Sequence, residues 1–222
     1  SIGLEKSIYA IHEGAVGETD LSNQVTYRLY LSTPNSDDIL TAVAGMDEYP
    51  LILSTTTSFY QEEILGNTVP DINLLWMEII PELEFDSWVT IGATPETYNI
   101  SEPIYTIESP YQPWVDPFES GGDIFTNDNI GGAWFSLHTF QNGVVGEDKK
   151  VLIAQLTTDG ELSVESMYVQ IMLNGDSNDD LRFQYQDSQH GCIYIENENS
   201  DCNGCISDED GDGVCDELEV SG

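Results

Sequence analysis

Ten short segments with the composition of β-strands follow one another through the first 188 residues, separated by turns rich in Gly, Asn and Asp. Their residues are β-branched, aromatic or alternately apolar and polar, which is typical of strands. This pattern predicts an all-β domain over residues 1–188, a β-sandwich with jelly-roll or cohesin-like topology. The segments span residues 6–12, 24–32, 38–45, 50–57, 86–92, 122–126, 133–140, 151–158, 164–173 and 181–186.

Two of these segments also predict how they are buried. In 24–32 every second side chain from Val25 to Leu31 is apolar or aromatic and lies on one face, whereas Thr26, Arg28 and Tyr30 lie on the other. That alternation indicates a half-buried strand. The segment 151–156, VLIAQL, is almost continuously apolar and is expected at the centre of a sheet.

One segment, 71–83, predicts a short helix instead. Its apolar side chains recur at helical spacing, Asp71 can cap its first turn, and Pro81 is expected to end it. The apolar positions are Ile72, Leu75, Trp76, Ile79 and Ile80.

The charge of the chain limits its partners. It has 41 acidic and 5 basic side chains, a formal net charge of −36, while 40% of its residues are hydrophobic. The apolar fraction is sufficient for a packed core. So negative a field excludes nucleic acid, because little basic surface is left to neutralise phosphates. It favours cations and a salty or calcium-rich medium that screens the repulsion. No apolar run reaches the roughly 18 residues of a membrane span, so no membrane insertion is expected.

The composition changes after about residue 188, where apolar residues become scarce. Residues 189–222 form an acidic segment that cannot offset its ordering entropy unaided. All four cysteines lie in it, and their C-x9-C-x2-C-x9-C spacing favours two disulfides over zinc, hence an oxidising compartment. Three pairings are possible, and we favour Cys192–Cys202 with Cys205–Cys215.

Within this segment, SDEDGDGVCDELE contains the D-x-D-x-D-G-x5-E pattern of an EF-hand calcium loop. Alternate carboxylates wrap one hard cation, Gly213 permits the turn, and the final glutamate closes the shell with two oxygens. The alternative is an acidic solvated tail, and the complete pattern favours calcium. The predicted Ca²⁺ ligands are Asp208, Asp210, Asp212, Val214 through its carbonyl, Asp216 and Glu219.

These residues carry a resemblance. CNGCISDEDGDGVCDELE resembles the acidic calcium repeats of thrombospondin type 3 and, less closely, half of a dockerin. It differs from a dockerin because it lacks the second calcium loop and the recognition helix. The resemblance implies an extracellular, calcium-rigidified spacer. TTTSFYQ, FDSWVTIG, GGAWF and VLIAQLTTDG resemble phrases of an uncharacterised domain in large modular secreted proteins of marine bacteria, which implies a β-rich surface module without a known activity.

A second candidate site is the proline-broken stretch 105–118, read as a loop without strands. Its four aromatic residues, Tyr105, Tyr111, Trp114 and Phe118, could stack on sugar faces. The alternative, which we favour, is that the loop packs its own rings over the end of the sheet. The three histidines are too few and too scattered for a metal cluster, and no familiar hydrolase or phosphate-binding motif is present.

Together these patterns predict a non-enzymatic, extracellular structural or adhesive module of a longer secreted or surface protein, with Ca²⁺ rigidifying its C-terminal junction. The expected partners are neighbouring domains or copies of the same polypeptide, and also glycans or other surface proteins. The alternative function is a carbohydrate-binding module that uses the aromatic stretch 105–118.

Overall fold

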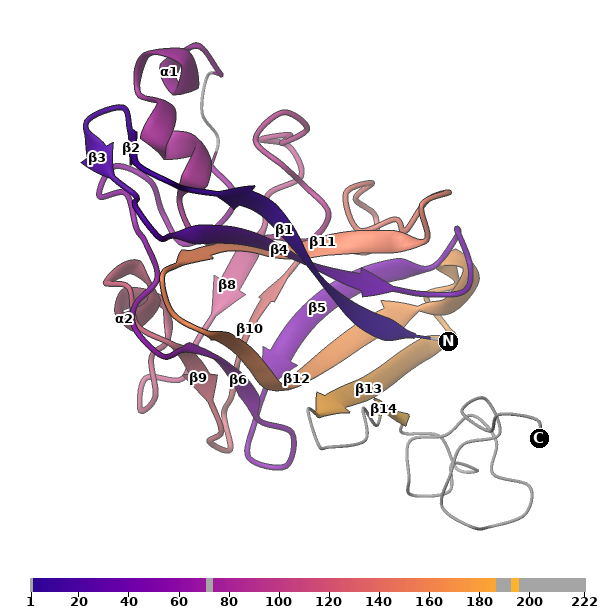
Figure 1. Cartoon of the computed structure of the whole chain (residues 1–222). Helices are drawn as coiled ribbons and strands as arrows, with labels where there is room; N and C mark the ends of the chain where they lie inside the picture. Colours follow the sequence, from indigo (N-terminus) through magenta and orange to yellow (C-terminus); the bar gives the residue numbers. More distant parts are fainter. Residues whose placement is uncertain (1, 71–73, 187–192, 196–222) are drawn as a thin grey trace, which may run out of the picture.

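The computed structural model describes residues 2–70, 74–186 and 193–195, and two antiparallel sheets form its body (Figure 1). The smaller sheet has the order β1-β4-β11-β7, with β1 (Gly3–Ile11), β4 (Val25–Ser32), β11 (Lys150–Thr158) and β7 (Trp88–Val89). The larger follows the order β14-β13-β12-β5-β10-β8, with β14 (Ile193–Ile195), β13 (Asp180–Gln186), β12 (Leu162–Met172), β5 (Ile39–Gly45), β10 (Gly132–Phe135) and β8 (Tyr105–Ile107). Off this path, β6 (Leu51–Thr55) pairs with β12 and with β9 (Ile124–Thr126), and β2 (Ala15–Val16) forms a small hairpin with β3 (Thr19–Asp20).

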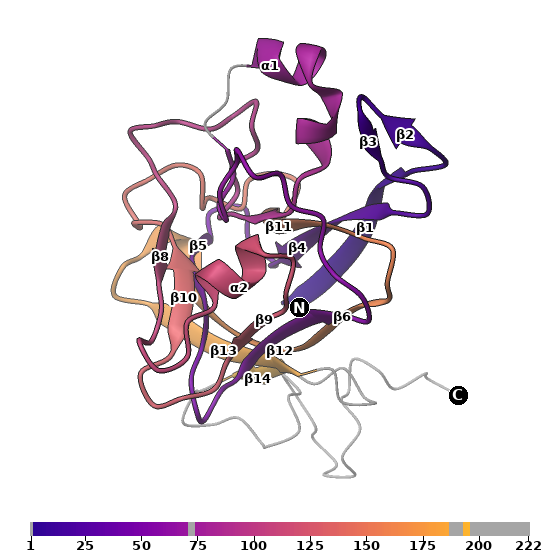
Figure 2. The same ribbon diagram turned by 90° about the vertical axis from the view of Figure 1, so that its left-hand side faces the viewer.

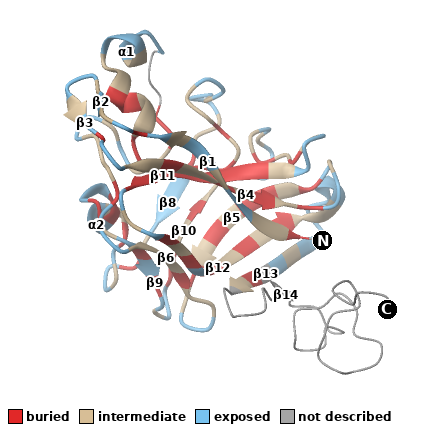
Figure 3. Ribbon diagram, viewed as in Figure 1, coloured by how far each residue is buried: buried red, intermediate tan, exposed pale blue. Residues whose placement is uncertain are grey.

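The hydrophobic core lies between the two sheets, as the alternating burial along the strands shows (Figure 3). In β12, Met167, Val169 and Ile171 are fully buried, while the residues between them are only partly covered. Strand β11 is buried along almost its whole length and lies between β4 and β7. The prediction that VLIAQL is a central strand is therefore confirmed.

The all-β prediction is also confirmed, since each of the ten expected segments overlaps an observed strand. The half-buried pattern of β4 is right for Leu29 and Leu31, which face the core. Thr26, expected on the open face, is buried as well. It is covered because His12 Nε2 and Thr26 Oγ1 are 2.9 Å apart, and the His12 ring packs edge-on against Phe85 at 4.4 Å.

The predicted helix is present as α1 (Leu74–Ile79), followed by a 3-10 turn, η1 (Pro81–Phe85). Residues 71–73, with the expected cap Asp71, lie outside the described residues. Pro81 does follow the helix, because a proline fits the first turn of η1 and not the interior of α1. No side chain of α1 is buried, and the helix projects from one end of the molecule in both views (Figures 1 and 2).

The structure has a second short helix, α2 (Val115–Glu119), where the sequence was expected to form a loop. The prediction of a single helix is therefore wrong. Prolines are expected to break a helix, but Pro117 lies in the first turn of α2, where its missing N–H is not needed.

Candidate functional site

The predicted calcium loop and disulfides fall outside the described residues. These include all six expected ligands, Asp208, Asp210, Asp212, Val214, Asp216 and Glu219, and all four cysteines, Cys192, Cys202, Cys205 and Cys215. Strand β14, from the predicted C-terminal segment, pairs with β13 and so extends the larger sheet past residue 188. In the described part of the chain, no group of three or more His, Cys, Asp or Glu side chains is arranged to hold a metal ion.

The aromatic stretch 105–118 divides into two buried and two exposed rings. Trp114 and Phe118 are almost fully buried, whereas Tyr105 is partly exposed and Tyr111 is 84% exposed. The stretch contains β8 and the start of α2, so the expectation of a strandless loop is wrong. Trp114 Nε1 donates to the carbonyl of Ile107 at 3.0 Å, which holds the indole ring inside.

This division decides between the two interpretations of the stretch. Trp114 and Phe118 pack over the sheet, as the favoured alternative expected, and they are not available to stack on a sugar. The four rings do not form one exposed platform. A carbohydrate site that used all four is therefore ruled out by their burial.

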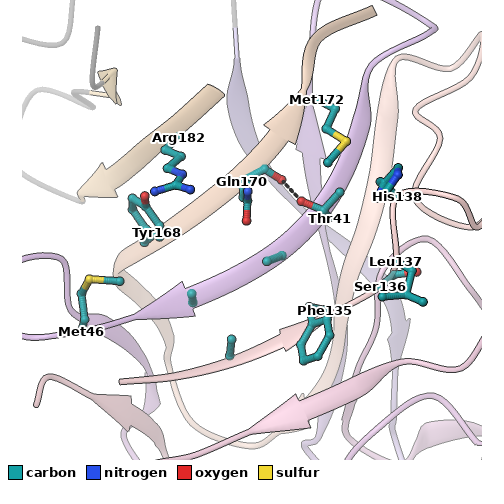
Figure 4. Close-up of a pocket in the computed structure, with 13 residues that line it drawn as sticks. Thr41, Met46, Phe135, Ser136, Leu137, His138, Tyr168, Gln170, Met172 and Arg182 are labelled. Atoms are coloured by element: carbon teal, nitrogen blue, oxygen red, sulfur yellow. Dashed lines mark hydrogen bonds between the residues drawn. The ribbon is translucent and has the colours of Figure 1, made fainter. Parts of the chain in front are cut away.

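A different site lies on the outer face of the larger sheet, where three neighbouring strands form a shallow groove (Figure 4). Its floor consists of Ala42 and Ala44 on β5 and Ala133 on β10. These side chains point away from the core, because their neighbours Val43 and Trp134 are the fully buried residues. Small side chains on the middle strand leave an open space of about 420 Å³ above the sheet.

Aromatic rings stand on both sides of this floor. On the β12 side, Tyr168 stacks on Tyr49 with ring centroids 5.2 Å apart and an angle of 19° between the planes. On the β10 side, Phe135 stacks on Tyr105 at 5.4 Å and 26°. Each wall ring that lines the groove is therefore backed by a second ring, which limits its rotation. Tyr105, a predicted ligand-binding residue, enters the site in this supporting role.

Polar groups complete the groove at its β13 edge. Arg182 Nε donates to Asp180 Oδ2 at 3.0 Å, and Gln170 Nε2 donates to the same oxygen at 2.9 Å. The pKa of Arg182 is raised above its ordinary value, mainly by the hydrogen bond to Asp180 and then by interaction with Tyr168. Thr41 Oγ1 donates to the Gln170 carbonyl at 3.1 Å (Figure 4). The polar side chains near the groove are thus held in defined positions.

One end of the groove is lined by Ser136, Leu137, His138 and Met172, and Met46 lies at the opposite end (Figure 4). Such a surface offers apolar ring faces, flexible thioethers and hydrogen-bond donors together. That combination suits a ligand whose faces are apolar and whose edges are polar. The sequence does carry a signal for it, namely two alanines at i and i+2 of one strand, opposite the buried positions.

A separate polar cluster lies near η1, away from the groove residues. Asp86 is fully buried; its Oδ1 accepts the backbone N–H of Glu62 at 2.7 Å, and its Oδ2 has no hydrogen-bond partner. Burial, the largest cause, raises the pKa of Asp86 to about 8, and the nearby charges of Glu62 and Glu119 add to it. Tyr60 donates its hydroxyl to Glu62, and burial raises the tyrosine pKa as well.

Comparison with known proteins gives no match, since no family model, curated protein or solved structure is similar to this chain. The thrombospondin-like resemblance and the jelly-roll or cohesin-like topology therefore stay predictions. None of the helices in the described part of the chain combines the length and apolar character needed to cross a bilayer.

Proposed function

We propose that this chain is a non-enzymatic adhesive module of an extracellular protein and that it binds glycans in the groove on the larger sheet. The single observation that carries the proposal is the pair of ring-backed walls, Tyr168 and Phe135, on either side of an alanine floor. Carbohydrate binding, the alternative function expected from the sequence, is adopted here, but its site moves from residues 105–118 to this groove.

The chemistry of the lining supports this function. Sugars present C–H faces that pack against aromatic rings, and hydroxyl edges that need hydrogen-bond partners. Tyr168 and Phe135 supply the rings, while Gln170, Arg182 and His138 supply polar atoms around them. Rings held by a second ring lose little conformational entropy when a ligand binds, which favours affinity.

A glycan array probed with the intact chain tests the proposal, followed by calorimetry on the best binder. Phe135→Ala should weaken binding roughly tenfold, the loss expected when one stacked ring is removed. Tyr111→Ala is the matched control, because Tyr111 is the most exposed aromatic ring described outside the groove. Silence on the array, or equal affinity of Phe135→Ala and the parent chain, would contradict the proposal.

A second proposal concerns residues 189–222, where Ca²⁺ would rigidify the junction to a neighbouring domain or copy in the longer polypeptide. It is supported by the complete ligand pattern from Asp208 to Glu219 and by the net charge of −36, which a divalent cation partly relieves. Extracellular modules of this kind bind calcium with Kd on the order of 0.1–1 mM, which suits calcium levels outside cells. The two disulfides and the extracellular location belong to this proposal.

Calcium titration by calorimetry of the chain and of Asp212→Ala tests this second proposal. Asp212→Ala should lose most of the binding heat, because it removes the ligand at position 5 of the loop. Limited proteolysis with and without EGTA should show faster cleavage near the C-terminus when calcium is removed. Equal heats from the two proteins, or cleavage that EGTA does not change, would contradict it.

A further inference from the structure

We infer that the glycan bound in this groove is a linear, neutral chain whose successive sugars are turned over relative to one another, as in β-1,4-linked glycans, and that it lies along β5. This inference rests on the proposed function and names the ligand class of the same site. It follows from the strand register, the placement of the two wall rings, and the charges around them.

The register places the two rings diagonally across β5. Tyr168 on β12 pairs with Ala44, and Phe135 on β10 pairs with Ala42. Ala42 and Ala44 are two residues apart, so the rings are offset by about 7 Å along the strand direction. They are separated across the groove by two strand spacings, about 10 Å. Opposite Tyr168 lies only Ala133, and opposite Phe135 lies Gln170.

A ligand that uses both rings must therefore turn an apolar face to one wall and, one step along its length, to the other wall. In a β-1,4-linked chain of hexopyranoses, neighbouring sugars are turned over, so the same face of successive sugars points to opposite sides. In an α-1,4-linked chain, neighbouring sugars keep similar orientations and the chain coils. The diagonal arrangement matches the first geometry, and the extended backbone of β5 between Ala42 and Ala44 runs along the floor in the direction that an extended chain would follow.

The charges exclude an acidic chain. Of the five basic side chains in the sequence, Lys6, Arg28 and Lys150 belong to the smaller sheet and Lys149 directly precedes β11, so Arg182 alone lines the groove. Arg182 already forms an ion pair with Asp180 at 3.0 Å. An acidic sugar would have to compete with Asp180 and approach a chain with a formal charge of −36. A neutral ligand neither competes with Asp180 for Arg182 nor is repelled by the net charge.

Four tetrasaccharides separate linkage from charge when they are titrated into the intact chain by calorimetry. They are the β-1,4-linked tetramers of glucose and N-acetylglucosamine, the α-1,4-linked tetramer of glucose, and the β-1,4-linked tetramer of mannuronic acid. At least one neutral β-linked tetramer should bind tenfold or more tightly than the α-linked and acidic ones. Tyr168→Ala and Phe135→Ala should each weaken it roughly tenfold, since each removes one stacked ring.

Two controls make the outcome decisive. Lys150→Gln removes a basic charge on the smaller sheet, and Tyr111→Ala removes an exposed ring outside the groove, so both should leave the affinity for the neutral tetramer unchanged. Preference for the α-linked or acidic tetramer, or a loss caused by only one of the two wall variants, would overturn the inference. Failure of all four tetramers would overturn it too. Should the array still detect a glycan that depends on Phe135, the proposed function would stand without this ligand class.

Discussion

Trp114 and Trp134 pack against each other in the core, with ring centroids 5.8 Å apart and planes inclined at 54°. Both indole nitrogens donate hydrogen bonds of 3.0 Å, Trp114 to the carbonyl of Ile107 and Trp134 to that of Thr90. Thr90 directly follows β7, so Trp134 connects the larger sheet to the smaller one. The pair thereby fixes both the 105–118 stretch and the contact between the layers.

Replacement of Trp114 should therefore cost far more stability than replacement of the nearby exposed Tyr111. Trp114→Ala removes a buried ring and a hydrogen bond, and should lower the free energy of unfolding by about 3–5 kcal/mol. Tyr111→Ala should change it by less than about 0.5 kcal/mol. Urea denaturation of both variants measures the difference. Similar midpoints for the two would show that the tryptophan pair does not hold the stretch.

Asp86 should make the protein less stable as the pH rises. Its folded pKa, about 8, lies above the ordinary value of 3.8, so the folded state holds the proton more tightly than the unfolded state. This contribution is fully present below pH 3.8 and is lost as the pH rises towards 8. Asp86→Asn should therefore stabilise the protein at pH 8 and have little effect near pH 4. The difference should grow by up to about 1.4 kcal/mol per pH unit.

The control for this prediction is Asp20→Asn. The hydroxyl of Ser22, the largest cause, and its backbone N–H lower the pKa of Asp20. Its stabilising contribution is therefore present at neutral pH and is lost in acid, so its pH dependence is opposite to that of Asp86. Thermal unfolding of both variants across this pH range checks the prediction. Parallel curves for Asp86→Asn and the parent chain would mean that the buried carboxyl does not titrate as stated.

The exposed helix α1 should contribute little to stability despite its apolar composition. Trp76 is 54% and Ile79 70% exposed, while Leu83 in the adjoining η1 is fully buried. Trp76→Gln should change the free energy of unfolding by about 0.5 kcal/mol or less. Leu83→Ala should lower it by about 2–5 kcal/mol because it leaves a cavity. Chemical denaturation of both variants decides, and a large loss in Trp76→Gln would show that the helix packs more tightly than its exposure indicates.

Gly17 should not tolerate alanine. It has a φ of +58°, and an added Cβ would lie 1.9 Å from Glu82 Oε2. Glu82 Oε1 in turn accepts the backbone N–H of Glu18 at 3.2 Å, which ties η1 to the β2–β3 hairpin. Gly17→Ala should therefore destabilise by more than about 1 kcal/mol.

Gly14 supplies the matched control for this position. Its Cβ would meet nothing within 4 Å, so Gly14→Ala should be nearly neutral. Thermal melts of the two glycine variants give the comparison. Equal melting temperatures would mean that the hairpin shifts freely away from η1.

Periodicity sufficed for strands such as β4, β5 and β12, which bury one face, and for β11, which buries both, because burial selects the residue types along a strand. It failed at β8 and α2, which are short and depend on tertiary contacts. Ile107 belongs to a strand because β8 pairs with β10, and its carbonyl receives the Trp114 hydrogen bond. Neither contact has a local signature in a proline-containing stretch.

The candidate groove could be predicted even less directly. The predicted aromatic site lies in one continuous stretch, whereas Tyr168 and Phe135 come from strands that are distant in sequence and that meet only through β5. The alternation of alanines with apolar residues in β5 is visible in the sequence. It indicates the floor of a groove only when the strands on either side of β5 are known. Asp86 was one acid among 41 in the sequence, and only its burial distinguishes it.

On the strands that carry the floor alanines, the side chains that stabilise the core are not the side chains that face a ligand. Val43 and Trp134 are buried in the core, while Ala42, Ala44 and Ala133 on the reverse side of the same strands line the groove. A larger side chain at any of the three would reshape the cleft without disturbing the interior. Single substitutions on this scaffold can therefore change which ligand is bound while the fold stays the same. These three positions are the natural place to engineer new selectivity.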